Sequence, residues 1–334
     1  MGHYLVTGAA GFIGARTSEM LIEQGHTVIG IDNMNNAYDP RMKEHRLKKL
    51  QGLAGFEFIQ DDISDRGIIN RIAFGASRGH PSIVNRKLDG VINLAARAGV
   101  RYSVQDPWIF LESNVTGTLN MLELCRQHGC KKFVMASTSS IYGANPPYPT
   151  PETASSSEPM QPYAASKKGA EAIAHAYHHL YDIDVTVVRY FTVYGPAGRP
   201  DLAMFRFVKW ITEGEPVQIY GDGTQSRGFT YVDDIARGTI AALKPVGYEI
   251  INLGGHEVIT INELVEMVEE LTGKRANVQY GPPNLADMYT NWADVSKARE
   301  MLGWNPQVNL REGIGSLIAW YNQEREWARE VLTG

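Results

Sequence analysis

Short apolar runs alternate with amphipathic stretches through the first two thirds of the chain. The runs are rich in β-branched residues and cover 3–8, 27–32, 56–62, 89–96, 131–137 and 185–191. Apolar segments of this length that recur between helical patterns are typical of a parallel sheet with helices on both faces. We therefore predict an α/β fold built on a doubly wound parallel (Rossmann) sheet.

The alternation of apolar runs and amphipathic stretches becomes less regular after Tyr190. Pro and Gly punctuate residues 194–201, 220–228 and 280–287, and amphipathic helices are indicated at 231–244 and 261–273. In open α/β folds, ligands bind at the carboxyl edge of the sheet, so we expect these loops to form a smaller C-terminal substrate-binding lobe over that edge. The predicted division gives 1–190 to the Rossmann domain, with 228–252 returning to it, and 191–227 and 253–334 to the lobe.

Composition and charge narrow the function classes. The chain has 334 residues, of which 43% are hydrophobic and 21% charged, and a formal net charge of −5. This balance gives no broad basic surface for a nucleic acid, and no apolar run is long enough for a membrane span. With no targeting segment visible, we expect a cytoplasmic protein. Cys125 and Cys130 lack metal-ligand spacing, so we predict buried thiols and no metal site.

A glycine-rich turn opens the first predicted helix. The sequence TGAAGFIG places Gly8, Gly11 and Gly14 after an apolar strand, where glycines let the backbone approach a pyrophosphate at a helix N-terminus. Asp32 ends the second strand about twenty residues beyond, where a carboxylate can bond ribose hydroxyls. Asp32 would repel a 2′-phosphate and no arginine follows it immediately, so we predict NAD as the cofactor.

A tyrosine and a lysine lie four residues apart at the start of a later helix. In PYAASKKGAEAIAH, Tyr163 and Lys167 project from one helical face. Tyrosine is a poor base because its pKa is ordinarily about 10. A lysine ammonium and an oxidised nicotinamide beside it would favour the phenolate, so the pair is a candidate for hydride-transfer chemistry.

These motifs together resemble the extended short-chain dehydrogenase/reductase family. The stretches TGAAGFIG, ASTSSIYG (136–143) and YAASK occur in that family's order, and the similarity continues through RYFTVYGP, RGFTYVDD and WADVSKAREMLGW. Members of the family modify nucleotide sugars on tightly bound NAD. The resemblance implies NAD contacts at Gly8, Gly11, Phe12, Ile13, Gly14, Asp32, Asn33, Asn35, Asp62, Ile63, Leu94, Ala95, Ala96, Arg97, Asn114, Tyr163, Lys167 and Tyr190.

The sequence of the loop 136–143 indicates which reactions of the family this site is not equipped to catalyse. Relatives that dehydrate nucleotide sugars have an Asp-Glu pair after the threonine, and relatives that decarboxylate UDP-glucuronate have a Glu two residues after it. This chain has Ser139 and Ser140 there, and hydroxyls are poor acids and bases near neutral pH. What remains is oxidation at C4 and its reversal, with Thr138 and Ser139 bonding the C4 oxygen beside Tyr163. The alternative is that these hydroxyls only cap the strand end.

The resemblance also suggests the sugar. Thr192 within RYFTVYGPAGRPD, and Arg101 within AGVRYS, look like the branch of the family that epimerises UDP-glucuronic acid. Ser140 and Thr192 offer hydroxyl donors to a C6 carboxylate, and Arg199 and Arg101 offer positive charge. An arginine expected before the late AD segment is missing, and Arg206 is a candidate replacement. The implied substrate contacts are Arg101, Thr138, Ser139, Ser140, Tyr163, Thr192, Arg199, Arg206, Gln218, Tyr220, Arg227 and Asp287.

The resemblance therefore implies NAD-dependent 4-epimerisation of UDP-glucuronic acid to UDP-galacturonic acid, with Tyr163, Lys167, Thr138 and Ser139 as catalytic residues. The alternatives left open are a UDP-hexose 4-epimerase, a UDP-glucuronate decarboxylase and a non-catalytic nucleotide-sensing protein. We also expect a homodimer, in which a helix from about Tyr102 to His128 and the helix with Tyr163 pair with their copies.

Overall fold

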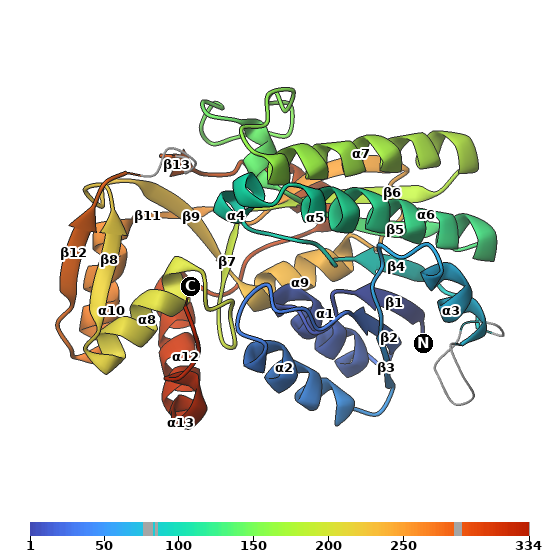
Figure 1. The fold of residues 1–334 in the computed structure, drawn as a ribbon. Coiled ribbons are helices and arrows are strands. Elements are labelled where there is room, and N and C mark those ends of the chain that lie inside the picture. The colour runs from blue at the N-terminus through green and yellow to red at the C-terminus, as the bar shows by residue number, and fades with distance from the viewer. Residues whose placement is uncertain (76–82, 84–85, 284–288, 334) are drawn as a thin grey trace.

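A seven-stranded parallel sheet forms the centre of the larger lobe (Figure 1). The computed structural model describes residues 1–75, 83, 86–283 and 289–333. The strand order is β10-β6-β5-β4-β1-β2-β3, with every neighbouring pair parallel. The strands are β1 (His3–Thr7), β2 (Thr27–Asp32), β3 (Phe56–Gln60), β4 (Gly90–Asn93), β5 (Lys132–Thr138), β6 (Asp184–Tyr190) and β10 (Tyr248–Leu253). The predicted Rossmann sheet is confirmed.

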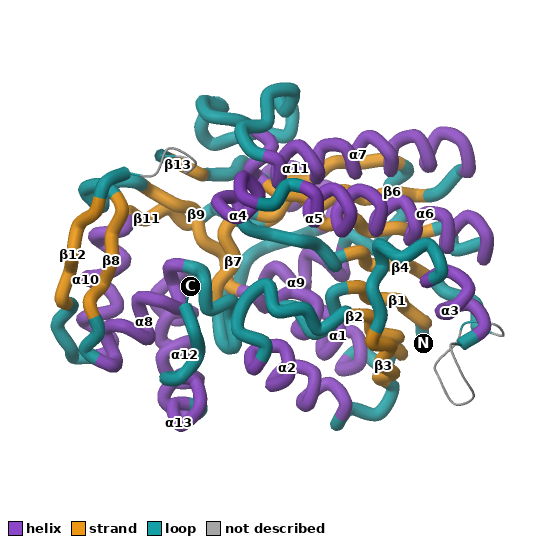
Figure 2. Tube along the Cα trace, in the orientation of Figure 1, coloured by secondary structure: helices purple, strands orange, loops and turns teal. Residues whose placement is uncertain are grey.

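Helices cover both faces of this sheet (Figure 2). One layer contains α1 (Phe12–Glu23), α2 (Arg41–Gln51) and α9 (Val232–Ala241), and the other contains α3 (Ile68–Phe74), α6 (Gly117–His128) and α7 (Pro162–Tyr181). Successive strand residues alternate between the two apolar cores, so Val6 and Val134 lie in one core while Leu5 and Phe133 lie in the other. This two-sided burial explains why the strands are continuous apolar runs.

The prediction of one continuous helix from about Tyr102 to His128 is wrong. Helix α4 (Val100–Gln105) ends before Pro107, and the chain then continues through α5 (Trp108–Phe110) and a π-helical segment, η1 (Leu111–Thr116), into α6. Asp106 takes φ −135° and ψ 83°, because a residue before proline avoids the helical region.

The second lobe is built from two small sheets and helices. A four-stranded sheet contains β7 (Thr192–Tyr194), β9 (Ser226–Tyr231), β11 (Glu257–Thr260) and β13 (Thr290–Asn291), and β8 (Pro216–Tyr220) pairs with β12 (Asn277–Gly281). Its helices are α8 (Ala203–Glu213), α10 (Ile261–Thr272), α12 (Leu310–Gln323) and α13 (Arg325–Ala328), and α11 (Ser296–Leu302) lies between α10 and α12 in the sequence. Side chains of α8, β9, α10 and α12 share a separate apolar core.

The boundaries between the lobes differ from the predicted division. Within 228–252, α9 and β10 do return to the large sheet, but β9 belongs to the smaller one. Within 253–334, α11 packs against β10 and α9 instead of the second lobe. In the part of the chain that the structure describes, no helix is both long and apolar enough to cross a membrane.

Candidate active site

A cavity of about 720 Å³ lies between the carboxyl ends of the large sheet and the second lobe. The glycine turn, the ends of β2, β4 and β5, and the start of α7 line it from one side. Segments around β7, α8, β8 and β13 line it from the other. All the predicted site residues in the described part line this cavity, with the exception of Asn114. Asp287 lies outside the described residues.

The glycine turn has no space for side chains. A Cβ on Gly14 would lie 2.1 Å from the Gly8 carbonyl oxygen, and one on Gly11 would lie 2.8 Å from it. Gly8 adopts a φ of +68°, and a Cβ there would lie 2.8 Å from the Ala95 nitrogen. Helix α1 begins at Phe12 with no side-chain cap on its N-terminal amides. The turn therefore fits a dinucleotide pyrophosphate held by backbone N–H groups.

Asp32 carries a partner that sequence reasoning missed. Its carboxylate accepts hydrogen bonds from Lys43 Nζ at 3.0 Å, from the Ala10 amide at 3.2 Å and from the Met34 amide at 2.9 Å. Lys43 and Asp32 are both buried and both line the cavity. The lysine offsets the charge that would repel a 2′-phosphate, so that argument for NAD is weaker than the sequence suggested.

The expected adenine end of the site is held by side-chain hydrogen bonds. Asn33 Nδ2 donates to Asp62 Oδ2 at 2.8 Å, and the Ser64 hydroxyl donates to Asp62 Oδ1 at 2.7 Å. Burial acts to raise the pKa of Asp62, but the hydrogen bonds from Ser64 and Asn33 outweigh it and lower that pKa. Asp62 is therefore a charged acceptor at this end of the cavity.

Asn114 is buried behind the wall of the cavity and does not line it, and its expected contact with NAD stays a prediction. It lies in the π-helical segment, is fully buried, and exchanges hydrogen bonds of 2.9 and 3.0 Å with the backbone of Arg97. It also donates to Ser166 Oγ on α7 at 2.9 Å. A π-helical turn rotates one residue out of the helical register, and here that residue ties the stretch 94–97 to α7.

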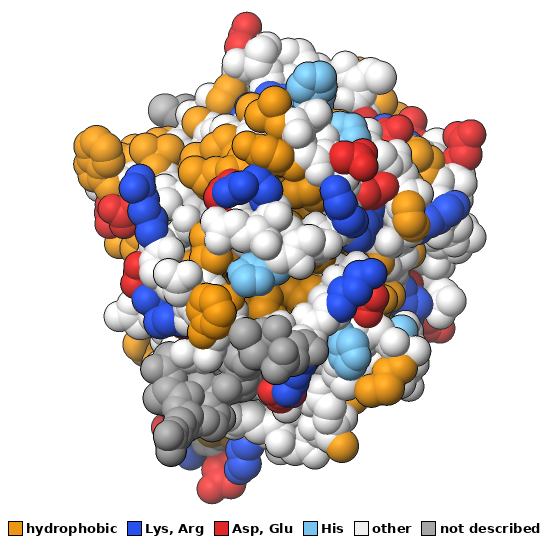
Figure 3. Space-filling model, turned by 90° about the vertical axis from the view of Figure 1, so that its right-hand side faces the viewer, with side chains coloured by type: hydrophobic (Ala, Val, Ile, Leu, Met, Phe, Trp, Pro, Cys, Tyr) orange, Lys and Arg blue, Asp and Glu red, His pale blue; other side chains and the backbone are white. Residues whose placement is uncertain are grey.

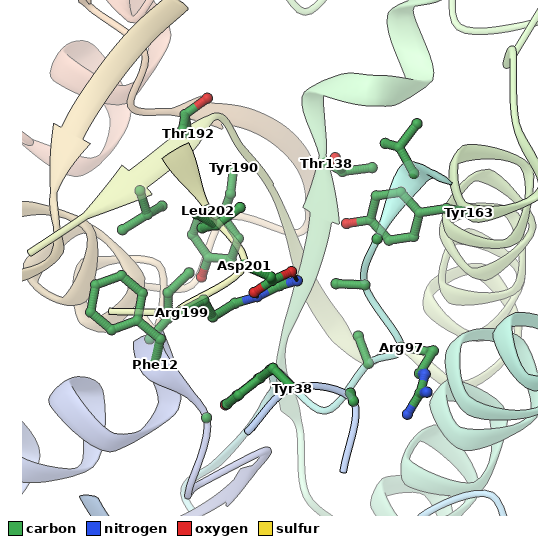
Figure 4. Close-up of a pocket in the computed structure, with 18 of the residues that line it drawn as sticks. Phe12, Tyr38, Arg97, Thr138, Tyr163, Tyr190, Thr192, Arg199, Asp201 and Leu202 are labelled. Atoms are coloured by element: carbon green, nitrogen blue, oxygen red, sulfur yellow. Dashed lines mark hydrogen bonds and ion pairs between the residues drawn. The ribbon is translucent and has the colours of Figure 1, made fainter. Parts of the chain in front are cut away.

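Tyr163 and Lys167 lie on one face of α7, as predicted. Figure 4 shows the Tyr163 hydroxyl pointing into the cavity, near Thr138. Lys167 Nζ is buried and donates to the Ala136 carbonyl at 2.9 Å. Burial lowers the pKa of Lys167 to about 8, against the opposing charge of Glu171, so the ammonium form persists at neutral pH.

The protein's own groups raise the pKa of Tyr163 above its ordinary value instead of lowering it. Burial raises it, and a hydrogen bond with Thr138 and the positive charge of Arg199 oppose the rise. Arg199, which comes from the other lobe, therefore adds positive charge near the phenol, a partner that the sequence did not indicate. Lys167 is bonded to the Ala136 carbonyl and so fixes α7 against the end of β5, and its effect on the phenol stays a prediction.

The hydroxyl loop forms a short 3-10 turn, η2 (Ser139–Tyr142). Thr138 Oγ1 accepts from the Ser140 amide at 3.2 Å and donates to Ser140 Oγ at 3.3 Å. The alternative of strand-end capping is thus observed for Thr138, although its side chain also lines the cavity. Ser139 Oγ accepts from Asn291 Nδ2 at 3.0 Å, a contact from β13 that the sequence did not indicate.

Arg199 is paired with a carboxylate inside the cavity. Its Nε and Nη2 donate to Asp201 Oδ1 and Oδ2 at 3.1 and 2.6 Å, and Figure 4 shows this pair facing Tyr163. Burial acts to raise the pKa of Asp201, but the Arg199 charge outweighs it and lowers that pKa. Asp201 is therefore ionised and cannot serve as a general acid near neutral pH.

The other predicted arginines also line the cavity, each with a protein contact. The Arg101 guanidinium lies 4.6 Å from the centre of the Tyr220 ring. Arg206 Nε donates to the Thr333 carbonyl at 2.8 Å, and Arg227 Nη1 donates to the carbonyls of Ser226 and Tyr289. Arg206 and Arg227, with Gln218 and Tyr220, line the cavity from the second lobe, and Arg101 lines it from α4 of the larger lobe. Guanidinium groups in such positions suit the binding of a diphosphate.

Arg46 joins the two walls of the cavity and was missed from the sequence. It is 4% exposed, and its guanidinium donates to the carbonyls of Ala10, Ala197 and Gly198 and to the Tyr38 hydroxyl. Ala10 belongs to the glycine turn, and 197–198 precede Arg199. Nothing in the helical pattern of residues 41–51 distinguished Arg46 from a solvated basic residue.

A model of the NAD-dependent epimerase/dehydratase family matches residues 4–254 of this chain. The similar proteins include a UDP-glucuronate 4-epimerase of Thermodesulfobacterium geofontis (strain OPF15), 50% identical over 333 residues and 99% of both chains.

Two solved structures give the same likeness in three dimensions. UDP-glucuronic acid 4-epimerase from Bacillus cereus, in complex with UDP-glucuronic acid and NAD, matches with a TM-score of 0.85 and 34% identity over 96% of this chain and 99% of that one. UDP-glucose 4-epimerase from Thermotoga maritima, with UDP-glucose, matches with a TM-score of 0.86 and 32% identity over 97% and 99%.

Proposed function

The chain belongs to the NAD-dependent epimerase/dehydratase family, and from that premise we propose that it interconverts UDP-glucuronic acid and UDP-galacturonic acid by epimerisation at C4. The observation that carries the proposal is the loop 136–143, which presents Thr138, Ser139 and Ser140 to the cavity beside Tyr163 and contains no carboxylate. Among the described residues, Asp201 is the carboxylate on the opposite wall near Tyr163, and it is held by Arg199 and stays ionised. The described part of the site thus offers no acid for the elimination of water, while it keeps the groups for oxidation at C4.

In the proposed reaction, Tyr163 accepts the proton of the C4 hydroxyl and later returns it. Thr138 and Ser139 bond the C4 oxygen, and Lys167 supports the end of β5 that carries them. NAD, when bound at the glycine turn with Asp32, Asn33 and Asp62 at its adenosine end, supplies the hydride acceptor and donor at C4. Arg101, Arg206 and Arg227 would hold the diphosphate, so the sugar can turn while the nucleotide stays in place.

Ser140 and Thr192 are proposed to distinguish an acidic sugar from a neutral one. Both line the cavity and both offer a hydroxyl donor to a C6 carboxylate. The likeness to a UDP-glucose 4-epimerase makes the neutral sugars the main rival. Decarboxylation is disfavoured because Ser140 stands at the position where decarboxylating relatives have Glu.

The test is incubation of the purified protein with UDP-glucuronate, UDP-glucose and UDP-N-acetylglucosamine, followed by NMR of the products. We expect UDP-galacturonate, with little UDP-pentose and slow turnover of the neutral sugars. Tyr163→Phe is the matched control, since it keeps the ring and removes the proton acceptor. Release of mainly CO₂ and a UDP-pentose, or faster turnover of UDP-glucose, would overturn the proposal.

We also propose a homodimer through α4, α5, α6 and α7. The exposed apolar residues Tyr102, Val104, Trp108 and Leu111 follow one another along the first part of this surface. Figure 3 shows hydrophobic side chains gathered at the height of α6 and α7. Light scattering at micromolar concentration would give twice the chain mass.

A cytoplasmic location remains a prediction, and the two buried free thiols fit a reducing compartment.

A further inference from the structure

Asn291 reaches the hydroxyl loop from a distant part of the chain. It is the last residue of β13, where it pairs with Arg227 of β9, and its side chain lines the cavity. Its Nδ2 donates to Ser139 Oγ at 3.0 Å, across 152 residues of sequence. The contact joins the second lobe to the loop that lies beside Tyr163.

In this hydrogen bond Asn291 is the donor and Ser139 is the acceptor. A serine hydroxyl has one proton to donate and two lone pairs to accept with, whereas an amide nitrogen of Asn can only donate. Asn291 therefore occupies a lone pair of Ser139, and the Ser139 proton points elsewhere. Ser139 is 4% exposed, and among the described residues the structure gives its proton no acceptor. A buried donor without a partner is unfavourable, so this proton is suited to an acceptor oxygen of a ligand in the cavity.

We propose that Asn291 is a positioning residue that holds the Ser139 hydroxyl as a donor toward the C4 oxygen of the sugar. The inference rests on the proposed function. Oxidation converts the C4 hydroxyl, which both donates and accepts, into a carbonyl that only accepts. A hydroxyl whose proton is fixed toward the sugar stabilises the carbonyl more than the starting alcohol, and so favours the oxidised intermediate.

Two substitutions at Asn291 test whether the direction of its hydrogen bond with Ser139 matters, or only the contact between the two side chains. Asn291→Asp has nearly the same shape, but its carboxylate only accepts, so it takes the Ser139 proton and turns the donor away from the sugar. Asn291→Leu removes the partner without reversing it. Each is made in the parent and in a Ser139→Ala background, and kcat/KM for UDP-glucuronate is measured, because a double-mutant cycle isolates the coupling between the two side chains.

We expect Asn291→Asp to lower kcat/KM by about tenfold or more in the parent, mainly through kcat, and Asn291→Leu to lower it less. In the Ser139→Ala background, both changes should have an effect of less than about threefold. The cycle subtracts the added negative charge, since any repulsion of the sugar carboxylate is present in both backgrounds. If Ser139→Ala turns over too slowly, the same variants are compared by UDP-glucuronate affinity in calorimetry, with the same pattern expected.

Ser226→Ala is the matched control for displacement of β13. Ser226 Oγ bonds Thr290 Oγ1 at 3.2 Å, next to Asn291, yet Ser226 does not line the cavity. It should leave kcat/KM within about twofold of the parent. Equal losses in both backgrounds, or an Asn291→Asp protein that matches the parent, would overturn the inference. If the parent instead epimerises another UDP-sugar, the proposed function fails, and the cycle run with that sugar still decides the role of Asn291.

Discussion

Replacing Arg46 should destabilise the protein and weaken sugar binding at the same time. The guanidinium donates to Ala197 O at 2.9 and 2.7 Å, to Tyr38 Oη at 2.8 Å, to Ala10 O at 3.1 Å and to Gly198 O at 3.3 Å. Ala197 also takes a φ of 53°, a left-handed conformation that costs a non-glycine residue roughly 1–2 kcal/mol. Arg46 therefore holds a strained loop against the glycine turn.

The expected magnitude follows from the acceptors left behind. Each buried carbonyl without a donor costs about 1–3 kcal/mol, and water entering the space left by the side chain recovers part of this. We expect Arg46→Ala to lower the free energy of unfolding by about 2–4 kcal/mol. Arg46→Lys should lower it by about half as much, because one ammonium cannot reach all three segments.

The functional effect should appear in KM more than in kcat. The loop that Arg46 anchors carries Arg199 and Asp201, which face Tyr163 across the cavity, whereas Tyr163 itself is fixed by α7. We expect KM for the UDP-sugar to rise on the order of tenfold in Arg46→Ala, which corresponds to about 1.4 kcal/mol.

The assay is urea unfolding of the NAD-loaded proteins at one fixed NAD concentration, followed by steady-state kinetics. Arg311→Ala is the control, because Arg311 forms an exposed ion pair with Glu270 at 2.9 Å, a type of pair worth about 1 kcal/mol or less. The reasoning is refuted if Arg46→Ala unfolds with the same free energy as Arg311→Ala, or if its KM equals that of the parent.

Three further predictions concern the cavity itself. Tyr163→Phe should reduce turnover by a factor of about 10²–10⁴ while the purified protein still carries NAD, as absorbance of a denatured extract would show. Burial lowers the pKa of Lys167 to about 8, below its unfolded value near 10.5. The free-energy cost of burying the ammonium is therefore fully present below pH 8 and is relieved as pH rises toward 10.5. Stability of the parent relative to Lys167→Met should therefore rise across pH 8–10 by at most about 1.4 kcal/mol per pH unit, and a flat difference would contradict this. Thr192→Ala and Ser140→Ala should each raise the UDP-pentose fraction or weaken binding of UDP-glucuronate relative to UDP-glucose, as NMR product analysis would measure.

The large sheet could be predicted because its strands are buried on both faces. Such strands appear in the sequence as local apolar runs, and the predicted run 185–191 lies within one residue of β6. The second lobe offered no such signal. Its strands have as few as two residues, and β7, β9, β11 and β13 come from segments up to about a hundred residues apart. Only tertiary packing brings these segments together.

The candidate site divides in the same way. Gly8, Asp32 and Tyr163 could be placed at the cavity from the sequence, because the motifs that contain them depend on spacing within one or two elements. Lys43 and Asn291 were missed because each acts through a residue on another segment, and the sequence does not say which pair will meet. The bonds of Asn114 to Arg97 and Ser166 were also missed, because Asn114 lies in a π-helical segment that the sequence did not indicate.

The pairing of Arg199 with Asp201 changes how an acidic sugar would be recognised. From the sequence, Arg199 reads as a free cation for the C6 carboxylate, but two hydrogen bonds to Asp201 neutralise most of that attraction. Recognition then falls to hydroxyls such as Ser140 and Thr192. This suits a reaction in which the keto sugar must present both faces of C4 in turn, because a bidentate arginine clamp would hold one orientation too firmly. Single hydroxyl bonds to the carboxylate, worth about 1.5–3 kcal/mol each, can be exchanged during the turn. Together they keep the carboxylate solvated by protein groups, which slows its loss as CO₂.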